Sequence, residues 1–528
     1  MSRKNSNGDK VKSTESWIWD AACSIRGAAD AAKYKDYILP LIFVKRLCDV
    51  FDDEIDRIAE KVKTRTKALQ LVERDKSLVR FYLPLRSKDP ERESTWDVIR
   101  TLSDKIGQQL TDILRSIAKE NTSLQGIIDR IDFNATTHGQ RDIDDDRLSK
   151  LIEKIAEKRL GLKDVEPDII GRSYEYLIRK FAEGSGQSAG EFYTPAEVGI
   201  IIAKIMDPEP GMEIYDPTCG SGGLLIKCEL VMEDKMTLRQ VKGDKKSKYA
   251  PLKLYGQEFT ANTWAMSKMN MVIHDMEGEI EIGDTLINPK FRKGNKLRTF
   301  DRVVANPMWN QGRDSLPYIN DDYFINDELE RFPAGSCGGK IDWGWVQHIY
   351  SSLNKNGRAA IVLDTGAASR GSGNQGNNKE KGCRKWFVDN DLIEGVLYLP
   401  ENLFYNTSAP GIIIVVNKSK KHKGKIYLMH AGKEFQKGDP KNYITEEGIE
   451  RIAKSYKAFK EEEKFSRLVN QDEVVKNDYN ISPSRYIQIT DAETYKPIGE
   501  LVEELKTLED EAASIDKELK SIFKKLGI

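Results

Sequence analysis

YDPTCGSGG, at residues 215–223, joins a short apolar run to an apolar stretch with helical spacing at residues 224–231. This order predicts a strand, a glycine loop and a helix. Small residues at 220–223 let backbone amides approach a ligand at the start of the helix, where the helix dipole favours a carboxylate or phosphate. The loop is not a GxGxxG motif, because Leu225 stands where the third glycine would be. Alone, such a loop is more often a plain turn than a binding site.

Two acidic residues follow the next two predicted strands. Glu258 ends the run LYGQE at residues 254–258, where an acid can accept hydrogen bonds from both hydroxyls of a ribose. Asp284 and Thr285 follow the third run, and the Asp284 carboxylate is suited to accept from an adenine amine. Three strand ends that carry a glycine loop and two acids together predict a nucleoside site.

The fourth predicted strand ends in Asn306-Pro307-Met308-Trp309. The exocyclic amine of a nucleobase is a poor nucleophile, because its lone pair is delocalised into the ring. The side-chain oxygen of Asn306 and the backbone carbonyl of Pro307 can accept hydrogen bonds from both N–H groups of the amine. These hydrogen bonds would localise the lone pair on the nitrogen. Trp309 offers a face for an extruded base, a stacking contact worth roughly 1 to 3 kcal/mol. In isolation, an Asn-Pro turn with a core Trp is the simpler interpretation.

The surrounding sequence predicts four blocks. Helical spacing at residues 16–52, 148–155 and 169–181 predicts a helical N-terminal domain, 1–185. Short β-like runs alternate with helical ones in 186–420 and predict a largely parallel, doubly wound α/β domain. The runs are 213–215, 252–255, 280–282, 302–305, 359–363, 393–399 and 412–416. The glycine-rich residues 365–385 are predicted to form a mobile loop, and 421–495 a small irregular docking segment.

The last block, 496–528, carries apolar residues at alternating spacings of four and three, typical of a coiled-coil helix. They are Leu501, Leu505, Leu508, Ala512, Ile515, Leu519, Ile522 and Leu526. The helix either packs on its own domain or docks on a partner.

In this combination the sequence resembles the S-adenosylmethionine-dependent amino-group DNA methyltransferases, and more closely the modification subunit of type I restriction-modification systems. Beyond the two motifs, the resemblance rests on YKDYILPLIFVKRLCDVF at 34–51, DIIGRSYEYLIRKFAEGSGQSAGEFYTP at 168–195 and DYNISPSRY at 478–486. It covers nearly the whole chain, and it implies a Rossmann-like, seven-stranded methyltransferase sheet.

The resemblance implies S-adenosylmethionine as cofactor, no metal, and a role for each motif. Residues 192–195 would line the site around the methionine end of the cofactor, and residues 219–222 would contact its backbone. Glu258 would bind the ribose hydroxyls, and Asp284 would bind the adenine. The implied cofactor-binding residues are Glu191, Phe192, Tyr193, Thr194, Pro195, Asp216, Thr218, Cys219, Gly220, Ser221, Gly222, Glu258, Asp284 and Thr285. The implied catalytic residues are Asn306, Pro307, Met308 and Trp309, with Met308 where the family usually has proline.

The target amine is expected to be adenine N6, because family members acting on cytosine N4 more often carry Ser in place of Asn306. Cytosine C5 methylation needs a Cys nucleophile, usually in a Pro-Cys pair, and no Cys follows a Pro here. The expected partners are double-stranded DNA, a specificity subunit flanked by two modification subunits, and a motor/nuclease subunit. The alternatives are a weakly active or non-catalytic scaffold, a solitary adenine methyltransferase, and a methyltransferase acting on protein glutamine or RNA.

Composition sets outer limits on these classes. The 528 residues include 83 Lys and Arg against 84 Asp and Glu, so no uniformly basic coat for gripping DNA is present. Alone, the chain is expected to bind DNA weakly. Six scattered cysteines without a CxxC pair indicate free thiols. No GxxxxGK[ST] loop is present, so ATP-driven motor activity is not expected from this chain alone. The longest apolar runs, such as 38–44 and 412–416, are far shorter than the ~20 residues that a membrane span needs, and residues 1–12 lack the apolar core of a secretory signal, so we expect a cytoplasmic protein.

Overall fold

The computed structural model describes residues 14–25, 35–165, 194–241 and 249–489, with isolated residues of 168–177 and 505–519. Single positions within these ranges are not described, namely 130, 138, 139, 313, 375, 377, 405, 406, 439 and 440. Within the described residues, no helix is both long and apolar enough to cross a membrane.

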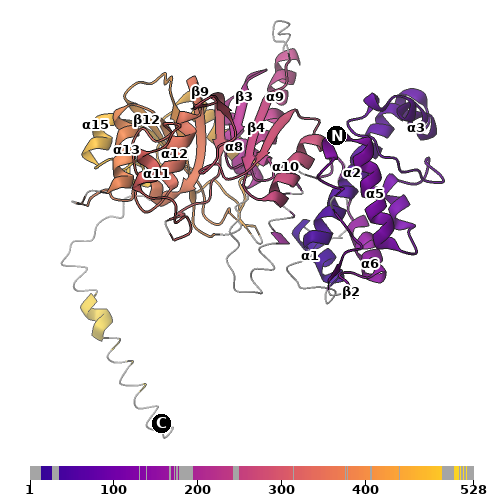
Figure 1. The fold of residues 1–528 in the computed structure, drawn as a ribbon. Helices are drawn as coiled ribbons and strands as arrows, with labels where there is room; N and C mark the ends of the chain where they lie inside the picture. The colour runs from indigo at the N-terminus through magenta and orange to yellow at the C-terminus, as the bar shows by residue number, and fades with distance from the viewer. Residues whose placement is uncertain are drawn as a thin grey trace.

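The N-terminal part is mainly helical (Figure 1). Its helices are α1 (Thr14–Ser24), α2 (Lys35–Val62), α3 (Arg65–Arg74), α4 (Thr95–Arg100), α5 (Ile106–Glu120) and α6 (Asp145–Ala156). The helix α5 shows why, because its buried residues Leu110, Leu114 and Ile117 recur at helical spacing on one face. Two short strands, β1 (Thr136–Thr137) and β2 (Gln140–Arg141), pair antiparallel, so the predicted helical domain also contains a hairpin.

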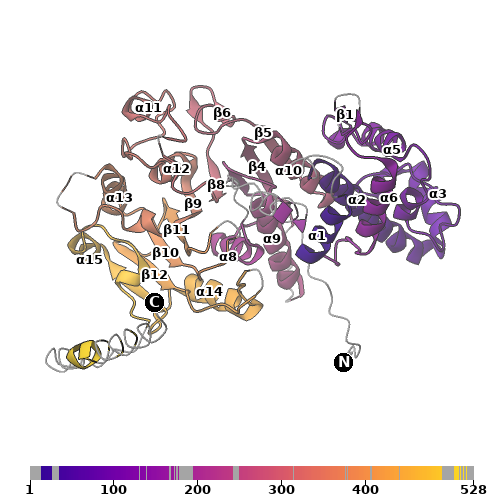
Figure 2. The same ribbon diagram turned by 90° about the horizontal axis from the view of Figure 1, so that it is seen from below.

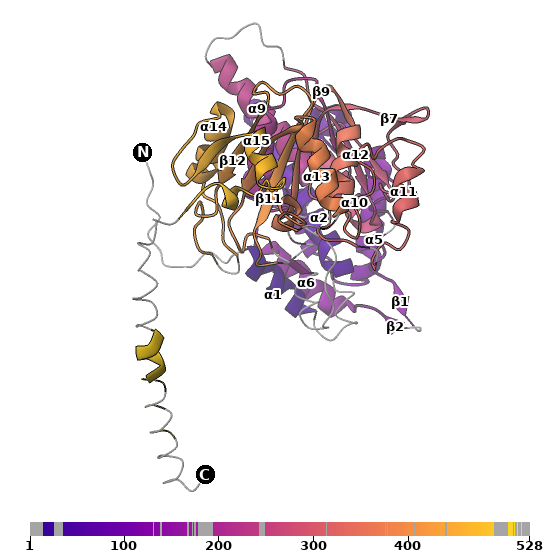
Figure 3. The same ribbon diagram turned by 90° about the vertical axis from the view of Figure 1, so that its left-hand side faces the viewer.

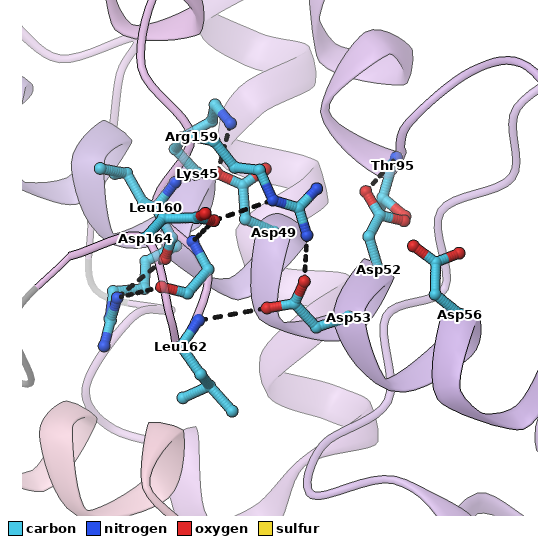
Figure 4. A network of polar contacts seen from close by, with 12 residues as sticks. Lys45, Asp49, Asp52, Asp53, Asp56, Thr95, Arg159, Leu160, Leu162 and Asp164 are labelled. Carbon is cyan, nitrogen blue, oxygen red and sulfur yellow. Dashed lines mark hydrogen bonds and ion pairs between the residues drawn. The ribbon is translucent and has the colours of Figure 1, made fainter. Parts of the chain in front are cut away.

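The segment after α6 is fixed to α2 by the carboxylates of Asp49, which is buried, and Asp53, which is partly exposed (Figure 4). Asp49 of α2 accepts from the amide of Leu160 at 2.7 Å, and Asp53 accepts from the amide of Leu162 at 3.1 Å. Lys45 and Arg159 form ion pairs with these same two carboxylates. Residues 160–162 are therefore held against α2.

A nine-stranded sheet forms the centre of the second part, in the order β13-β12-β10-β11-β9-β8-β3-β4-β5 (Figure 2). Its strands are β3 (Glu213–Asp216), β4 (Lys253–Glu258), β5 (Gly278–Ile282), β8 (Phe300–Ala305), β9 (Leu353–Asp364), β10 (Ile393–Tyr398), β11 (Gly411–Asn417), β12 (Lys425–His430) and β13 (Ser466–Asn470). Five of the eight pairings are parallel; β11 runs antiparallel to β9 and β10, and β13 to β12.

Helices cover both faces of this sheet. Alternate strand residues point to opposite faces, so that Ile214 joins one core cluster and Tyr215 the other. The first cluster includes α8 (Ala196–Met206), α9 (Gly223–Val241) and α14 (Glu446–Ala458). The second includes α12 (Asp342–Ser351) and α13 (Lys379–Asp389). At the β5 end, α10 (Ala261–Ile273) packs its residues Met266, Met269 and Ile273 into the core of the N-terminal helices.

All seven predicted strands are present, but the predicted total of seven is too low. Residues 421–489, predicted to be irregular, instead supply β12 and β13 together with α14 and α15 (Gln471–Lys476). Five of the six residues of β12 are buried, because β12 pairs parallel with β10. The sheet therefore extends two strands beyond the predicted domain boundary at residue 420.

The predicted mobile loop at 365–385 is also different in the structure. Its described residues form a short 3-10 helix (Thr365–Ala368) and the start of α13. Arg384, fully buried, donates to the carbonyls of Ala367, Arg370 and Tyr479. One guanidinium thus satisfies two carbonyls of the 367–370 turn and a third from Tyr479, which ties this turn to a distant part of the chain.

The described C-terminal residues 505–510 lie away from the body in Figures 1 and 3. Residues 505–510 are helical, and the apolar residues Leu505, Leu508, Ile515 and Leu519 are 41% to 61% exposed. The described part of the predicted seam therefore does not pack on its own domain. Leu501, Ile522 and Leu526 lie outside the described residues.

Candidate cofactor and catalytic site

The candidate site lies at the carboxyl ends of four neighbouring parallel strands. β3 pairs with both β8 and β4, and β4 pairs with β5. Asp216 ends β3 and Glu258 ends β4, while Asp284 and Asn306 directly follow β5 and β8. Because the strands are parallel, these four residues share one edge of the sheet, where ligands bind in open α/β sheets.

The glycine loop has backbone angles that glycine adopts most readily. Gly220 has a φ of +55° and Gly222 a φ of +83°, both in the left-handed region. The amide of Gly222 donates to the carbonyl of Cys219 at 2.8 Å, and the amide of Cys219 donates to the carbonyl of Gln257 at 3.0 Å. A Cβ atom on Gly220 would meet no atom within 4 Å. The loop is thus tied to β4, with open space beside Gly220 for a ligand.

Glu258 joins the glycine loop to the end of β4. Its Oε2 accepts from the amide of Gly220 at 3.0 Å, and its Oε1 accepts from the amide of Thr260 at 2.8 Å. A carboxylate offers about four acceptor positions. Backbone amides of the glycine loop and of the turn after β4 therefore orient the Glu258 carboxylate at the end of the strand, where a hydrogen-bond acceptor fits the nucleoside part of S-adenosylmethionine.

Asp216 is almost fully buried beneath the loop and accepts from the amide of Thr218 at 3.0 Å. Burial raises the pKa of Asp216 to about 8, and the Thr218 hydrogen bond only partly opposes this shift. Thr285 donates its hydroxyl proton to the carbonyl of Pro217 at 2.6 Å, which ties the segment after β5 to the glycine loop. Asp216 therefore supports the glycine loop through Thr218, and Thr285 holds the loop against the segment after β5.

Asp284 is oriented by its own turn and by a tyrosine. Its Oδ1 accepts from the amide of Leu286 at 2.8 Å, and its Oδ2 accepts from the hydroxyl of Tyr318 at 2.9 Å. Sequence analysis missed Tyr318, which lies 34 residues further along the chain. The amide of Ile287 also donates to Oδ1 at 3.3 Å. Three of the roughly four acceptor positions of the carboxylate are therefore used, and one is left for an adenine amine.

A buried network under Ser221 was also missed. Asp168 is almost fully buried and accepts from the hydroxyl of Ser221 and from Nδ2 of Asn270 at 2.7 Å. Asn270, on α10, also donates to the carbonyl of Ser221 at 2.9 Å. A Cβ atom on Gly223 would lie 2.6 Å from Oδ2 of Asp168. The segment leaving the N-terminal helices therefore supports the cofactor loop directly.

The side chain of Asn306 is held from two sides. Its Nδ2 donates to Oγ1 of Thr194 at 3.0 Å, and its Oδ1 accepts from Nε1 of Trp309 at 3.1 Å. These contacts fix which end of the amide carries the oxygen, and one of the two lone pairs on Oδ1 stays available. Pro307 is buried, and Sδ of Met308 lies 3.5 Å from Nε2 of Gln311.

Trp309 is half-buried and packs edge-on against Phe404, with ring centroids 4.8 Å apart and an interplanar angle of 72°. A Cβ atom on Gly411, the first residue of β11, would approach both rings at 3.0 Å or less. Sequence analysis missed Phe404, 95 residues after Trp309. The pair forms an aromatic wall beside Asn306.

The lead-in segment is described only in part. Pro195 is buried at the start of α8. Oγ1 of Thr194 accepts from Asn306, so this part of the segment lies against the catalytic motif. Glu191, Phe192 and Tyr193 lie outside the described residues.

Comparison with known proteins identifies the family. Residues 165–494 match the family model described as N-6 DNA Methylase, and residues 14–155 match the model of the HsdM N-terminal domain. The chain belongs to the N-6 DNA methylase family. Together the two models span both parts of this N-6 DNA methylase.

Relatives of this N-6 DNA methylase are methylase subunits of type I restriction enzymes. It is 38% identical over 368 residues to the MjaVIII methylase subunit of Methanocaldococcus jannaschii, covering 67% of this chain but 59% of the relative. It is 31% identical to the MjaVII methylase subunit of the same organism, covering 89% and 78% of the two chains. A solved type I methyltransferase subunit from Streptococcus thermophilus is 25% identical, with a TM-score of 0.65 and 90% and 99% coverage.

These findings confirm the predicted resemblance. The chain is an adenine-specific DNA methyltransferase of the type I modification subunit family, with S-adenosylmethionine as the cofactor of that family. The α/β methyltransferase fold is confirmed as well.

Proposed function

We propose that Asn306, Pro307 and Trp309 carry methyl transfer to the N6 amine of a flipped adenine, and that the chain does so as the modification subunit of a type I complex. The observation that carries this proposal is the position of Asn306. It lies at the end of β8, beside the strand that leads into the glycine loop, with its amide oriented by Thr194.

The proposed chemistry needs positioning more than activation. Bound S-adenosylmethionine supplies an electrophilic methyl group on a sulfonium. The available lone pair of Asn306 Oδ1 and the carbonyl of Pro307 accept hydrogen bonds from the two N–H groups of the amine. These hydrogen bonds localise the lone pair on the nitrogen. Transfer of that methyl group to the amine nitrogen would leave the cofactor as a neutral thioether, and the methylated amine would release one proton to solvent. Trp309 stacks on the base and holds it in line.

No covalent nucleophile is required, and the nearest thiol is unsuited to be one. Cys219 is buried, and burial raises the pKa of its thiol well above the ordinary value. A neutral, buried thiol does not attack a base. This supports amine methylation over a mechanism that proceeds through a cysteine adduct.

The cofactor roles follow the same geometry. We assign the ribose hydroxyls to Glu258, the adenine amine to Asp284, and the remaining contacts to the loop residues Thr218 to Gly222, shaped by Asp216 and Thr285. Thr194 and Pro195 belong to the wall at the methionine end, together with the predicted residues Glu191, Phe192 and Tyr193. Met308 has no polar role in this assignment.

The exposed apolar residues of the C-terminal helix support a docking role. Leu505, Leu508, Ile515 and Leu519 lie at coiled-coil spacing and are exposed. We propose that this helix docks on the specificity subunit, that two modification subunits flank it, and that a motor/nuclease subunit joins for restriction. Deleting residues 496–528 should abolish co-purification with the specificity subunit and leave cofactor binding intact; unchanged co-purification would contradict this assignment.

The function is tested in cells that express the chain with and without its specificity subunit, followed by methylation-sensitive sequencing. N6-methyladenine at defined sites only when both subunits are present supports the proposal. Methylation by the chain alone identifies a solitary enzyme, and the absence of methylation in both cases identifies a scaffold.

A further inference from the structure

The turn that follows Trp309 is held by contacts to a single residue, Asn310. Asn310 has a φ of +57°, a left-handed conformation that Asn tolerates better than most residues. Its amide donates to Oδ1 of Asp342 at 3.0 Å, and its carbonyl accepts from Nζ of Lys340 at 2.8 Å. Its side-chain oxygen accepts from Nη1 of Arg370 at 3.0 Å. The residue next to Trp309 is therefore fixed through its backbone and its side chain together.

Arg370 connects this turn to three other elements. Its guanidinium forms ion pairs with Asp342, the first residue of α12, and with Asp364, the last residue of β9. Its Nε and Nη2 also donate to Glu380, in the first turn of α13, at 2.9 Å and 2.7 Å. A planar group with five donors can bridge several acceptors at once, which the point charge of a lysine cannot do.

The network is well shielded from solvent on the side of its carboxylates. The side chain of Asp342 is fully buried and that of Glu380 is 7% exposed, while Arg370 is 25% exposed. A Cβ atom at Gly366 would overlap the guanidinium, so the backbone leaves room for Arg370 at that point. Removing the arginine would therefore leave buried negative charge behind, and the adjacent turn would lose its support.

We infer that Arg370 is a positioning residue for methyl transfer, acting through Asn310 and Asp342 to fix the turn that aims Asn306 and Trp309 at the target base. This inference rests on the proposed function of Asn306. Arg370 touches neither the glycine loop nor Glu258 in the described contacts, so its effect belongs to the catalytic step and not to cofactor binding.

The charge balance around Asp342 gives the inference a distinctive pH signature. Burial raises the pKa of Asp342 to about 6, while Arg370 and the Asn310 amide oppose this rise. The other charged groups of the network are Asp364 from β9, Glu380 from α13 and Lys340 from the segment before α12. Without Arg370 the pKa of Asp342 rises further, so that the carboxyl takes up a proton at a higher pH and then accepts less strongly from Asn310.

The test compares Arg370→Met, Arg370→Lys and Asn310→Gly in the full complex with the specificity subunit, measuring kcat, cofactor Kd and the pH dependence of kcat. Arg370→Met should lower kcat by about 100-fold, the scale of a small misplacement in an active site, with cofactor Kd unchanged. The acid limb of its pH dependence of kcat should shift to higher pH, because methyl transfer requires Asp342 to be ionised. Arg370→Lys should restore part of kcat.

Asn310→Gly keeps the left-handed turn and the Arg370–Asp342 pair, so it should lower kcat by roughly tenfold without moving the acid limb. Arg451→Met is the matched control, because Arg451 also bridges two carboxylates, Glu434 and Glu462. It should leave all three quantities unchanged.

Wild-type kcat in Arg370→Met overturns the inference. So does a fall in kcat that equals the loss of cofactor binding, or one that leaves the acid limb in place, since a purely structural role predicts those results. If the wild-type complex transfers no methyl group, the proposed function has failed, and this failure is seen before any variant is compared.

Discussion

Replacing Glu258 with alanine should weaken binding of S-adenosylmethionine by about two orders of magnitude. The two carboxylate oxygens accept from the amides of Gly220 and Thr260, which hold the carboxylate in place at the end of β4. Two further hydrogen bonds from ribose hydroxyls to a charged acceptor contribute about 1.5 kcal/mol each at the lower end of their range. Their loss amounts to about 3 kcal/mol, or roughly 150-fold in Kd.

Glu258→Gln provides an intermediate value. The amide keeps one acceptor oxygen, but its NH2 group must face the amide of either Gly220 or Thr260. We expect the loss of about one charged hydrogen bond, and so a Kd roughly tenfold above that of the wild type. The Kd for S-adenosylmethionine should therefore be highest for Glu258→Ala, intermediate for Glu258→Gln and lowest for the wild type.

Isothermal titration calorimetry of the full chain with S-adenosylmethionine measures these values directly. Glu434→Ala is the matched control, since Glu434 also accepts from a partner, Arg451, but lies outside the proposed site. Thermal unfolding of each variant shows that the fold is retained. An alanine variant that binds the cofactor as tightly as the wild type would refute the assignment of Glu258 to the ribose.

Three further predictions concern single side chains. Thr194→Val should lower kcat about tenfold, because the Asn306 amide loses its orienting acceptor, whereas Thr194→Ser should keep activity. Trp309→Ala should raise the KM for DNA by roughly 5- to 150-fold in steady-state assays, with cofactor Kd unchanged. For Asp216, the folded-state pKa of about 8 lies above the unfolded value of about 3.9, so the folded protein retains a proton that the unfolded chain has released. Wild-type stability therefore falls as pH rises through this window, and the melting-temperature advantage of Asp216→Asn should grow from about pH 5 to about pH 8; a constant difference would contradict the shift.

Much of the sheet was predictable because its central strands are buried on both faces and appear as short apolar runs. All seven residues of β11 are buried, and its run at 412–416 was found. In contrast, β12 follows the lysine-rich residues 418–425, and β13 is only five residues long with a mixed burial pattern. Their place in the sheet depends on pairing with β10 and with each other, which no local pattern reports.

The same limit applies to the site. Strand-end motifs located Asp216, Glu258, Asp284 and Asn306, because each lies at the end of a recognisable strand or within two residues after it. The residues that support them come from distant segments, and Asp168 and Asn270 are 102 positions apart. A distant supporting residue has no spacing signal, since its role arises only when the fold brings two segments together.

The glycine-rich residues 365–385 show how composition can mislead. Glycine suggested mobility, yet Gly366 leaves room for Arg370, and Gly371 has a φ of +81°. Glycine at these positions makes space and allows a turn. Arg370 and Arg384 then hold the segment through carboxylates and carbonyls.

The most direct test of the central claim is nucleoside analysis by mass spectrometry of DNA treated with the complex of this chain and its specificity subunit. With S-adenosylmethionine, the wild-type complex should produce N6-methyladenine. Asn306→Ala should bind the cofactor normally and produce almost none, because the amine loses the acceptor that localises its lone pair. Wild-type levels of N6-methyladenine from Asn306→Ala, or a methyl group found on cytosine instead, would contradict the account.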